Sequence, residues 1–533
     1  MKNRAQHLVL LALALLTIYG AQAAPRRDKA PAVDTNALIA HTPLGKLRGA
    51  KVKDVYVWKG IRYAQAPVGD MRFKAPVPVK AWTGTQDALS FGAVAPQQES
   101  SIAGKEPQAE DCLYLNVWSP GADAKKRPVM VWIHGGGFVI GSGSSQMYEG
   151  TQMATNGDVV IVTINYRLGP LGFLYFNEEQ RKQGFENNLG IKDQIAALKW
   201  VQQNIAAFGG DPAQVTIFGE SAGGTSVQTL LASPLTKGLF TKAIVQSGPA
   251  GIIWKPQNAT LITEKYMSLL GLKPTELAKL KTIPVDTLVA AEEKLIDYMV
   301  SELNDKVFCP TVDGDLLPHD LFTCVKNSGN IPLLIGTNLD ESSIFASNAL
   351  KMMPKDAKGF EQYFATVNPD TALRKRLTSS YPAYPRKRAV LNLLTDAVFR
   401  IPAIRLAECH MGHAPVYMYR FEWSSPSLNM IGLRSFHGLE IPFVFGAIDE
   451  GRGKLLKIIA TKRTRTRMIG QMQGAWLNFA KYGNPNGKDG TGGLGWQPYT
   501  TTNRHTMIFN KKVKQLTDPN ATERQAWDGV VYY

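Results

Sequence analysis

Short apolar runs of strand length alternate with amphipathic helical segments along most of the chain. Runs rich in Val and Ile, without polar interruption, indicate strands that are buried on both faces of a sheet. We expect such strands at residues 129–133, 159–165, 215–218, 242–246, 332–335 and 416–421. Helical spacing predicts helices over 192–208 and 222–232. The alternation favours an α/β fold with a large, mostly parallel central sheet flanked by helices.

Two longer stretches, 261–303 and 354–410, have a mainly helical pattern. We expect them to be insertions that pack over the carboxyl edge of the sheet, where open α/β sheets bind their ligands. No internal repeat and no Gly/Ser-rich linker interrupts the chain. Residues 24–533 are therefore expected to form a single domain.

Composition narrows the class of protein. The chain has 533 residues, of which 44% are hydrophobic and 20% charged, so it resembles a soluble globular protein with a sizeable core rather than a disordered one. Only four cysteines are present, which excludes a disulfide scaffold, and whether Cys309 and Cys324 are bridged stays open. The formal charge of +16 is not gathered into a basic stripe with interleaved aromatic residues. We therefore expect no nucleic-acid partner.

The first 23 residues have the pattern of a signal peptide. Lys2 and Arg4 precede an apolar stretch over 8–19, and Ala21-Gln22-Ala23 offers a small-x-small cleavage pattern. The stretch is short for a membrane span, although an uncleaved anchor is the alternative. We expect a secreted or periplasmic protein that begins near Ala24 and has no stable membrane insertion.

The segment Gly219-Glu220-Ser221-Ala222-Gly223 is a G-x-S-x-G motif between a predicted strand and a predicted helix. In that context the motif indicates a nucleophile elbow. The turn is so sharp that the residues two positions before and two positions after the serine must lack side chains. The turn exposes the serine hydroxyl and holds its backbone in a strained conformation. Ser221 is the candidate nucleophile.

Acyl chemistry on a serine also needs hydrogen-bond donors for the oxyanion that forms. Such donors are expected on a loop after an earlier strand. The segment His134-Gly135-Gly136-Gly137-Phe138 follows the strand over 129–133, and consecutive glycines let backbone N–H groups turn toward one point. This segment is the candidate oxyanion loop.

With these motifs in place, the chain resembles the type-B carboxylesterase/lipase family, the esterase/lipase/cholinesterase branch of the α/β-hydrolase fold, and in particular secreted carboxylesterases of bacterial type. The resemblance extends over nearly all of the chain after the signal peptide. Beyond the two glycine-rich motifs, it is carried by Gly60-Ile61-Arg62-Tyr63-Ala64, Glu110-Asp111-Cys112-Leu113-Tyr114-Leu115-Asn116, Asn165-Tyr166-Arg167, Phe208-Gly209-Gly210-Asp211-Pro212, Gln246-Ser247-Gly248 and Gly483-Asn484-Pro485-Asn486.

The resemblance implies the rest of the site. It assigns the triad acid to Glu341, in Gly336-Thr337-Asn338-Leu339-Asp340-Glu341, with Asp340 as the local alternative. It assigns the base to His437, which opens His437-Gly438-Leu439-Glu440. The order Ser, Glu, His is that of α/β-hydrolases. Backbone N–H groups of Gly136, Gly137 and Ala222 would form the oxyanion hole. No metal and no organic cofactor is expected.

Several neighbours are expected to be supporting residues. Ser247 would either orient Glu341, as the family suggests, or cap a strand end. Glu110 and Asp111 are expected to form ion pairs with Arg62 and Arg167.

His410 and His413, which also follow Glu341, have the spacing of a surface pair at a helix end. The aromatic residues Trp200, Trp476 and Trp496 are expected in the core.

Departures from the family pattern bear on the substrate. No cysteine precedes Cys112, so the family's bridge to an upstream partner is absent, and no aromatic residue lies between Gly92 and Ala109. Ile102 occupies the position of the choline-binding tryptophan, so a dedicated choline esterase is disfavoured. Asn304 and Lys306 replace acyl-pocket aromatics, which weakly favours neutral or acidic esters.

We expect a carboxylesterase acting on small to medium esters, as a monomer or weak homo-oligomer. A lipase on longer-chain esters and an amidase or carbamate hydrolase are the alternatives within the enzyme class. A non-catalytic adhesion module is disfavoured because all three candidate triad residues are present.

Overall fold

The computed structural model describes residues 39–99, 106–299, 307–326, 328–348, 350–368, 370–447, 453–490 and 493–530. The predicted signal peptide lies outside the described residues, as do Ile102, Asn304 and Lys306. No helix among the described residues is both long enough and apolar enough to cross a membrane.

Within the described residues, eleven strands form one large sheet in the order β14-β13-β12-β11-β10-β9-β7-β8-β6-β4-β3. The strands from β8 to β13 run parallel, and the edges are antiparallel at β14 and at β6, β4 and β3. Their bounds are β3 (Ala50–Val52), β4 (Val55–Arg62), β6 (Tyr114–Ser119), β7 (Arg127–Ile133), β8 (Val160–Ile164), β9 (Gly210–Glu220), β10 (Lys242–Gln246), β11 (Leu333–Asn338), β12 (Val416–Phe421), β13 (His505–Phe509) and β14 (Lys514–Thr517). A second sheet joins β1 (Ile39–Thr42), β2 (Gly45–Arg48) and β5 (Thr85–Asp87).

The large sheet is buried on both faces. Along β7, Val129, Val131 and Ile133 enter one core, whereas Met130 and Trp132 enter the other. Successive side chains of a strand point to opposite faces, so a strand covered on both sides needs apolar residues at every position. This is why the central strands are mostly apolar in the sequence on both faces.

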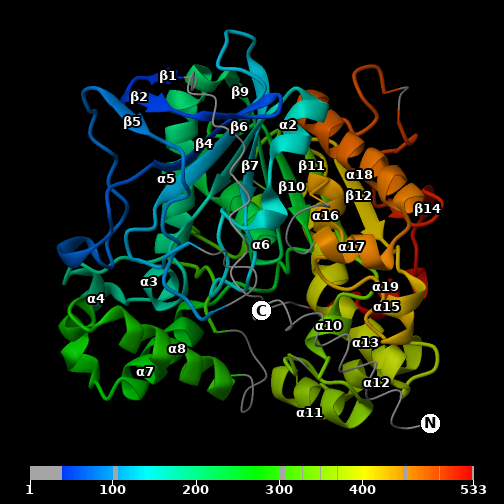
Figure 1. Cartoon of the computed structure of the whole chain (residues 1–533). Helices are drawn as coiled ribbons and strands as arrows, with labels where there is room; N and C mark the ends of the chain where they lie inside the picture. The colour runs from blue at the N-terminus through cyan, green and yellow to red at the C-terminus, as the bar shows by residue number, and fades with distance from the viewer. Residues whose placement is uncertain are drawn as a thin grey trace.

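Helices cover the two faces and the carboxyl end of the sheet (Figure 1). Residues of α5 and α6 belong to the first core, and residues of α16 and α18 to the second. The bounds are α2 (Thr151–Gly157), α3 (Gly169–Phe173), α4 (Glu178–Arg181), α5 (Leu189–Asn204), α6 (Ala222–Ala232), α7 (Pro256–Leu269), α8 (Val285–Tyr298), α9 (Leu321–Val325), α10 (Ser342–Phe345), α11 (Ala357–Val367), α12 (Thr371–Ser380), α13 (Lys387–Thr395), α14 (Ile401–His410), α15 (Pro426–Met430), α16 (Ile441–Phe445), α17 (Gly453–Ile459), α18 (Lys462–Tyr482) and α19 (Ala521–Ala526).

The six predicted strands and two predicted helices are confirmed. The observed bounds of α6, β10 and β12 coincide with those predicted, whereas β9 is longer and begins at Gly210. The two helical stretches contain most of α7 and α8, and α11 to α14. Figure 1 shows α7 and α8, and α11 to α13, beyond the same end of the sheet, whereas residues of α14 belong to the first core. The antiparallel edges and the second sheet were not anticipated. The strands β1, β2, β3 and β5 are short and partly exposed, and the more buried β4 and β6 mix polar with apolar residues.

The cysteines and tryptophans also have clear positions. None of the four cysteines is in a disulfide in the described part of the chain, so Cys309 and Cys324 are not bridged. Three of the thiols are buried and the Cys409 thiol is half-buried. Trp200, Trp476 and Trp496 lie in the core as expected.

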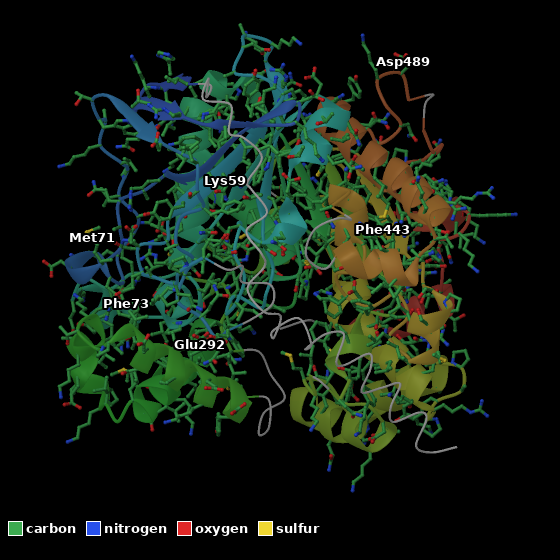
Figure 2. All side chains as sticks on the ribbon, viewed as in Figure 1. Lys59, Met71, Phe73, Glu292, Phe443 and Asp489 are labelled. Carbon is green, nitrogen blue, oxygen red and sulfur yellow. The ribbon has the colours of Figure 1, made fainter. Side chains whose placement is uncertain are left out.

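One buried acid stands apart from every ion pair. Glu292, on α8, is 1% exposed, and both its carboxylate oxygens lack a hydrogen-bond partner among the described residues. It lies where the helices of the first insertion meet the body of the molecule (Figure 2), and its carboxyl group rests against the backbone of Gly169 at the start of α3. Burial raises the pKa of Glu292 well above the ordinary range, so the folded protein holds a neutral carboxyl there.

We expect Glu292→Gln to stabilise the protein increasingly as pH rises. In the unfolded chain this carboxyl ionises near pH 4.3, whereas in the folded chain it stays protonated to higher pH, so its contribution to stability falls with rising pH between the two pKa values. The slope is about 1.4 kcal/mol per pH unit, and glutamine carries no such cost. Thermal unfolding of both proteins at pH 4, 6 and 8 measures the difference. The exposed neighbour Glu293, changed to Gln, is the control, and a difference that does not grow with pH would contradict a buried neutral carboxyl.

Candidate active site

Ser221 occupies the turn between β9 and α6. Its backbone angles, φ 58° and ψ −125°, lie in a region that residues with side chains rarely adopt. The Ser221 amide donates a hydrogen bond to the Gln246 carbonyl at 3.0 Å, and its carbonyl accepts one from the Thr225 amide at 2.9 Å. The strained serine of the expected elbow is thus present, and hydrogen bonds hold it on both sides.

Two glycines make this turn possible. A Cβ atom on Gly223 would lie 2.0 Å from the carbonyl oxygen of Ile133, at the end of β7. A Cβ atom on Gly219 would lie 2.6 Å from the backbone of Gly223. Both distances are shorter than any real Cβ contact. Glycine at position 223 therefore allows α6 to approach the end of β7, and glycine at position 219 allows β9 to approach α6.

His437 and Glu341 meet in the buried space beside this turn. Glu341 directly follows the turn after β11, and His437 lies in the loop between α15 and α16. Nδ1 of His437 lies 2.6 Å from Oε2 of Glu341, and the other oxygen, Oε1, accepts a hydrogen bond from the Asn338 amide at 2.6 Å. Glu341 is fully buried. The carboxylate is therefore fixed on one side by backbone and directs its second oxygen at the imidazole.

The other imidazole nitrogen faces the elbow. Nε2 of His437 lies 3.1 Å from Oε1 of Glu220, the residue before Ser221, and makes no hydrogen bond to any described residue. The His437 ring packs against the stacked rings of Phe345 and Phe399, with 5.0 Å between its centroid and each of theirs. The contact with Glu220 places the Nε2 atom beside the residue that precedes the serine.

Three buried glutamates set the electrostatics around His437. Burial lowers the pKa of the imidazole, but the charges of Glu220 and Glu341, with a smaller effect of Glu440, outweigh it and raise the pKa to about 9. Burial and the neighbouring Glu341 raise the pKa of Glu440. The site therefore favours a cationic imidazole more than water does.

A hydrogen-bond network behind the histidine was not predicted. Glu440 accepts hydrogen bonds from Nδ2 of Asn338 at 2.7 Å and from Nε2 of Gln246 at 3.1 Å. Nε1 of Trp476 in turn donates to Oε1 of Gln246 at 2.9 Å. The sequence did contain a signal for this network, namely the positions of its residues. Gln246 and Asn338 end adjacent parallel strands, and Glu440 follows His437 by three residues.

The glycine-rich loop after β7 packs against the serine turn. A Cβ atom on Gly135 would lie 3.0 Å from Cβ of Ser221, and one on Gly136 would lie 2.0 Å from the Ile140 carbonyl oxygen. Gly136 and Gly137 both have positive φ, 112° and 64°. Within the described residues, the N–H groups of Gly136, Gly137 and Ala222 donate no hydrogen bond. Three N–H groups beside the serine thus remain available to a ligand.

The loop is held from behind by two polar side chains. The Tyr166 hydroxyl donates a hydrogen bond to the His134 carbonyl at 2.8 Å, and its ring stacks on the His134 imidazole. Gln97 accepts a hydrogen bond from the Gly141 amide and donates one to the Gly141 carbonyl. Burial lowers the pKa of His134 to about 4, so this histidine is neutral and part of the scaffold.

The structure decides two alternatives that the sequence left open, the choice between Asp340 and Glu341 and the role of Ser247. Asp340 does not reach His437, because its carboxylate pairs with Arg388 and accepts hydrogen bonds from Ser435. Ser247 does not orient Glu341: its hydroxyl has no hydrogen-bond partner among the described residues, while its amide donates to the Gly336 carbonyl at 2.8 Å. The backbone of Asn338, which approaches more closely than a side chain from β10, takes the orienting position.

The expected ion pairs are partly wrong. Arg62 does pair with Asp111, but the partner of Glu110 is Arg72, at 2.5 Å. Spacing along the chain cannot show which arginine is nearest in space.

The partner of Arg167 is Asp193, at 2.7 Å and fully buried. His410, expected on the surface, is buried and contacts Ser328 and the Ile331 carbonyl. Among the described residues, no three His, Cys, Asp or Glu side chains are arranged to hold a metal ion.

We expect Gly223→Ala to abolish activity by destroying the turn. The added methyl group would meet the carbonyl oxygen of Ile133, the last residue of β7, at 2.0 Å, so α6 must move away from β7 and Ser221 must move with it. Ester turnover and circular dichroism, measured together, test this. Gly474→Ala on α18 is the control, because nothing lies within 4 Å of the added methyl and alanine favours helix. Unchanged turnover in the Gly223 variant would show that the close approach is not required.

Comparisons with known proteins agree with this geometry. The carboxylesterase family model matches residues 36–527. The para-nitrobenzyl esterase of Bacillus subtilis is 38% identical over 91% of this chain and 98% of its own, and carboxylesterase 1E of Mus musculus is 34% identical over 90% of each. A thermophilic PNB esterase structure superimposes with a TM-score of 0.82 at 36% identity, covering 92% of this chain and 99% of that chain. A Geobacillus stearothermophilus carboxylesterase gives 0.79 at 38% identity, covering 92% and 100%. The chain therefore belongs to the carboxylesterase family, has the α/β-hydrolase fold and is a carboxylic ester hydrolase.

Proposed function

We propose that the protein hydrolyses small to medium carboxylic esters with Ser221 as nucleophile, His437 as base and Glu341 as the acid that orients the base. The observation that carries the proposal is the buried contact of 2.6 Å between His437 Nδ1 and Glu341 Oε2, with Nε2 lying 3.1 Å from Oε1 of Glu220, the residue before Ser221. A neutral histidine bonded at Nδ1 keeps Nε2 as the proton acceptor.

In the acylation step the Ser221 hydroxyl attacks the ester carbonyl while His437 takes its proton at Nε2. Glu341 holds the imidazole in the correct tautomer and stabilises the cation that results. Backbone N–H groups of Gly136, Gly137 and Ala222 would bind the oxyanion, and the loss of one such donor typically costs about 10²–10³ in rate. Because Ala222 is the first residue of α6, the positive end of that helix dipole would also stabilise the oxyanion.

In the following steps His437 gives its proton to the departing alcohol, and water then repeats the sequence to free the acid. Each proton transfer uses Nε2, which makes no hydrogen bond to any described residue. The residues described above can perform all of these steps, so the mechanism calls for no metal or organic cofactor. A lipase acting on longer acyl chains and an amidase or carbamate hydrolase use the same chemistry, and they differ in the pocket that holds the acyl or leaving group.

We expect Ser221→Ala to lower kcat by about 10⁴-fold or more, since the nucleophile of such a triad is indispensable. The measurement is turnover of p-nitrophenyl esters of increasing acyl length, which also separates an esterase from a lipase. A phosphonate inhibitor should label Ser221, as located by mass spectrometry. Ser233→Ala, a buried serine at the other end of α6, is the matched control and should keep its turnover and label. A label on another residue would overturn the assignment.

We expect kcat/KM to rise with pH, about tenfold per unit, to a midpoint above 6.5, because His437 must be neutral to accept a proton and its pKa is raised to about 9. Glu220→Gln should move the midpoint to lower pH by about one unit, since it removes a negative charge that favours the imidazolium. The exposed Glu293→Gln variant should leave the midpoint unchanged. A rate independent of pH from 5 to 8 would contradict His437 as the base.

A further inference from the structure

Asp340 connects two segments that lie almost a hundred residues apart in the sequence. Its side chain is 5% exposed, and its Oδ2 atom accepts hydrogen bonds from the Ser435 hydroxyl at 3.0 Å and the Ser435 amide at 3.3 Å. The Asp340 amide also donates to the Ser435 carbonyl at 3.1 Å. Asp340 precedes Glu341 and Ser435 lies two residues before His437, so these bonds join the segments that carry the candidate acid and base.

A single helical rod of the second insertion supports the same two segments. Arg388, at the start of α13, forms an ion pair with Oδ1 of Asp340. At the end of α13, the Thr395 hydroxyl accepts a hydrogen bond from the Ser342 amide at 3.1 Å. The π-helical turn Asp396–Arg400 continues the rod and places the Phe399 ring 5.0 Å from the His437 ring. Interruptions of this type are frequent at functional sites.

The loop before His437 needs such support. Arg434 has φ 55°, a left-handed conformation that is costly for a residue with a side chain. The Ser343 hydroxyl bonds to both the Asp340 and the Leu433 carbonyls, at 2.7 and 2.6 Å. On one side of Arg434, Leu433 is linked to Asp340 through Ser343, and on the other side Ser435 bonds to Asp340 directly. The loop before His437 is thus fixed relative to the turn that carries Asp340 and Glu341.

We propose that Asp340 is a positioning residue for the reaction: with Arg388 as its counterion, it sets the distance between the segments of Glu341 and His437. The inference rests on the proposed function. It assigns a new role to the carboxylate that competes with Glu341 in the sequence. A displacement of about 1 Å in a reacting group can cost about 10²-fold in rate. The contacts of Asp340 with Arg388 and Ser435 should therefore affect kcat rather than substrate binding.

The effect is mechanical rather than electrostatic. The charges that raise the pKa of His437 are those of Glu220, Glu341 and Glu440. Asp340 directs its charge at Arg388 instead: burial lowers the pKa of Arg388, and the ion pair with Asp340 opposes that effect. Neutralising Asp340 should therefore lower kcat without moving the pH midpoint, which is the opposite of what Glu220→Gln should do.

The test compares Asp340→Asn, Arg388→Met and Arg388→Lys with the wild type. We expect Asp340→Asn and Arg388→Met to lower kcat by about 10- to 100-fold with KM and pH midpoint unchanged. Phosphonate labelling of Ser221 should slow by the same factor. Arg388→Lys should restore much of the rate because it keeps the charge. Ser435→Ala removes only the hydrogen bond from the Ser435 hydroxyl to Asp340. We expect this variant to fold and to show a smaller decrease in kcat.

Asp518→Asn is the control for general destabilisation. Asp518 makes a comparable two-point ion pair with Arg524, near the C-terminal helix α19. It should lower the unfolding temperature but leave kcat unchanged. If Asp340→Asn behaves like this control, or if it moves the pH midpoint, the positioning role is wrong. If wild-type Ser221 takes no phosphonate label, the proposed function itself fails, so the two failures are distinct.

Discussion

The close approach of β9 to α6 is the constraint on which the rest of the site depends. Gly219 has no side chain that would separate β9 from α6, and Gly223 has none that would separate α6 from the end of β7. Ser221 is left with a backbone conformation that only a tightly bounded turn can maintain. The turn places the candidate nucleophile between the strand and the helix, and Ala222 at the start of α6. Strain at one residue is tolerated because two buried cores hold the strand and the helix on either side.

A second requirement is the burial of three carboxyl groups around one imidazole. Each has partners that limit the cost of burial: the Asn338 amide bonds to Glu341, side-chain amides bond to Glu440, and Glu220 lies against the imidazole itself. The result is a histidine whose cation is favoured, which suits a group that becomes charged during the proposed reaction. Glu292 shows the contrast, since a buried carboxyl without partners stays neutral and lowers stability as pH rises.

Much of the fold could be predicted because local patterns report it directly. The central strands are mostly apolar, and α6 begins and ends where its pattern does. The strands β2 and β3 escaped prediction because they are short and mostly exposed, so hydrophobic periodicity carries little information about them. His410 was misplaced for a related reason: helix spacing describes a face, but only packing against Ile331 and Ser328 shows that this face is covered.

The amino-acid sequence by itself determined the α/β-hydrolase fold, the family, and the candidate nucleophile and base, because each is carried by residues that are close together in the chain or follow in a set order. For the acid it left two adjacent carboxylates, Glu341 and Asp340. The tertiary structure alone decided the partners. Glu341 could be separated from Asp340 only when one carboxylate was found against His437 and the other against Arg388. Likewise Glu110 pairs with Arg72, and Asn338 rather than Ser247 orients the acid. Ion pairs and hydrogen bonds depend on distances of a few ångströms between distant segments, and those distances arise only when the sheet brings the ends of its parallel strands to one edge.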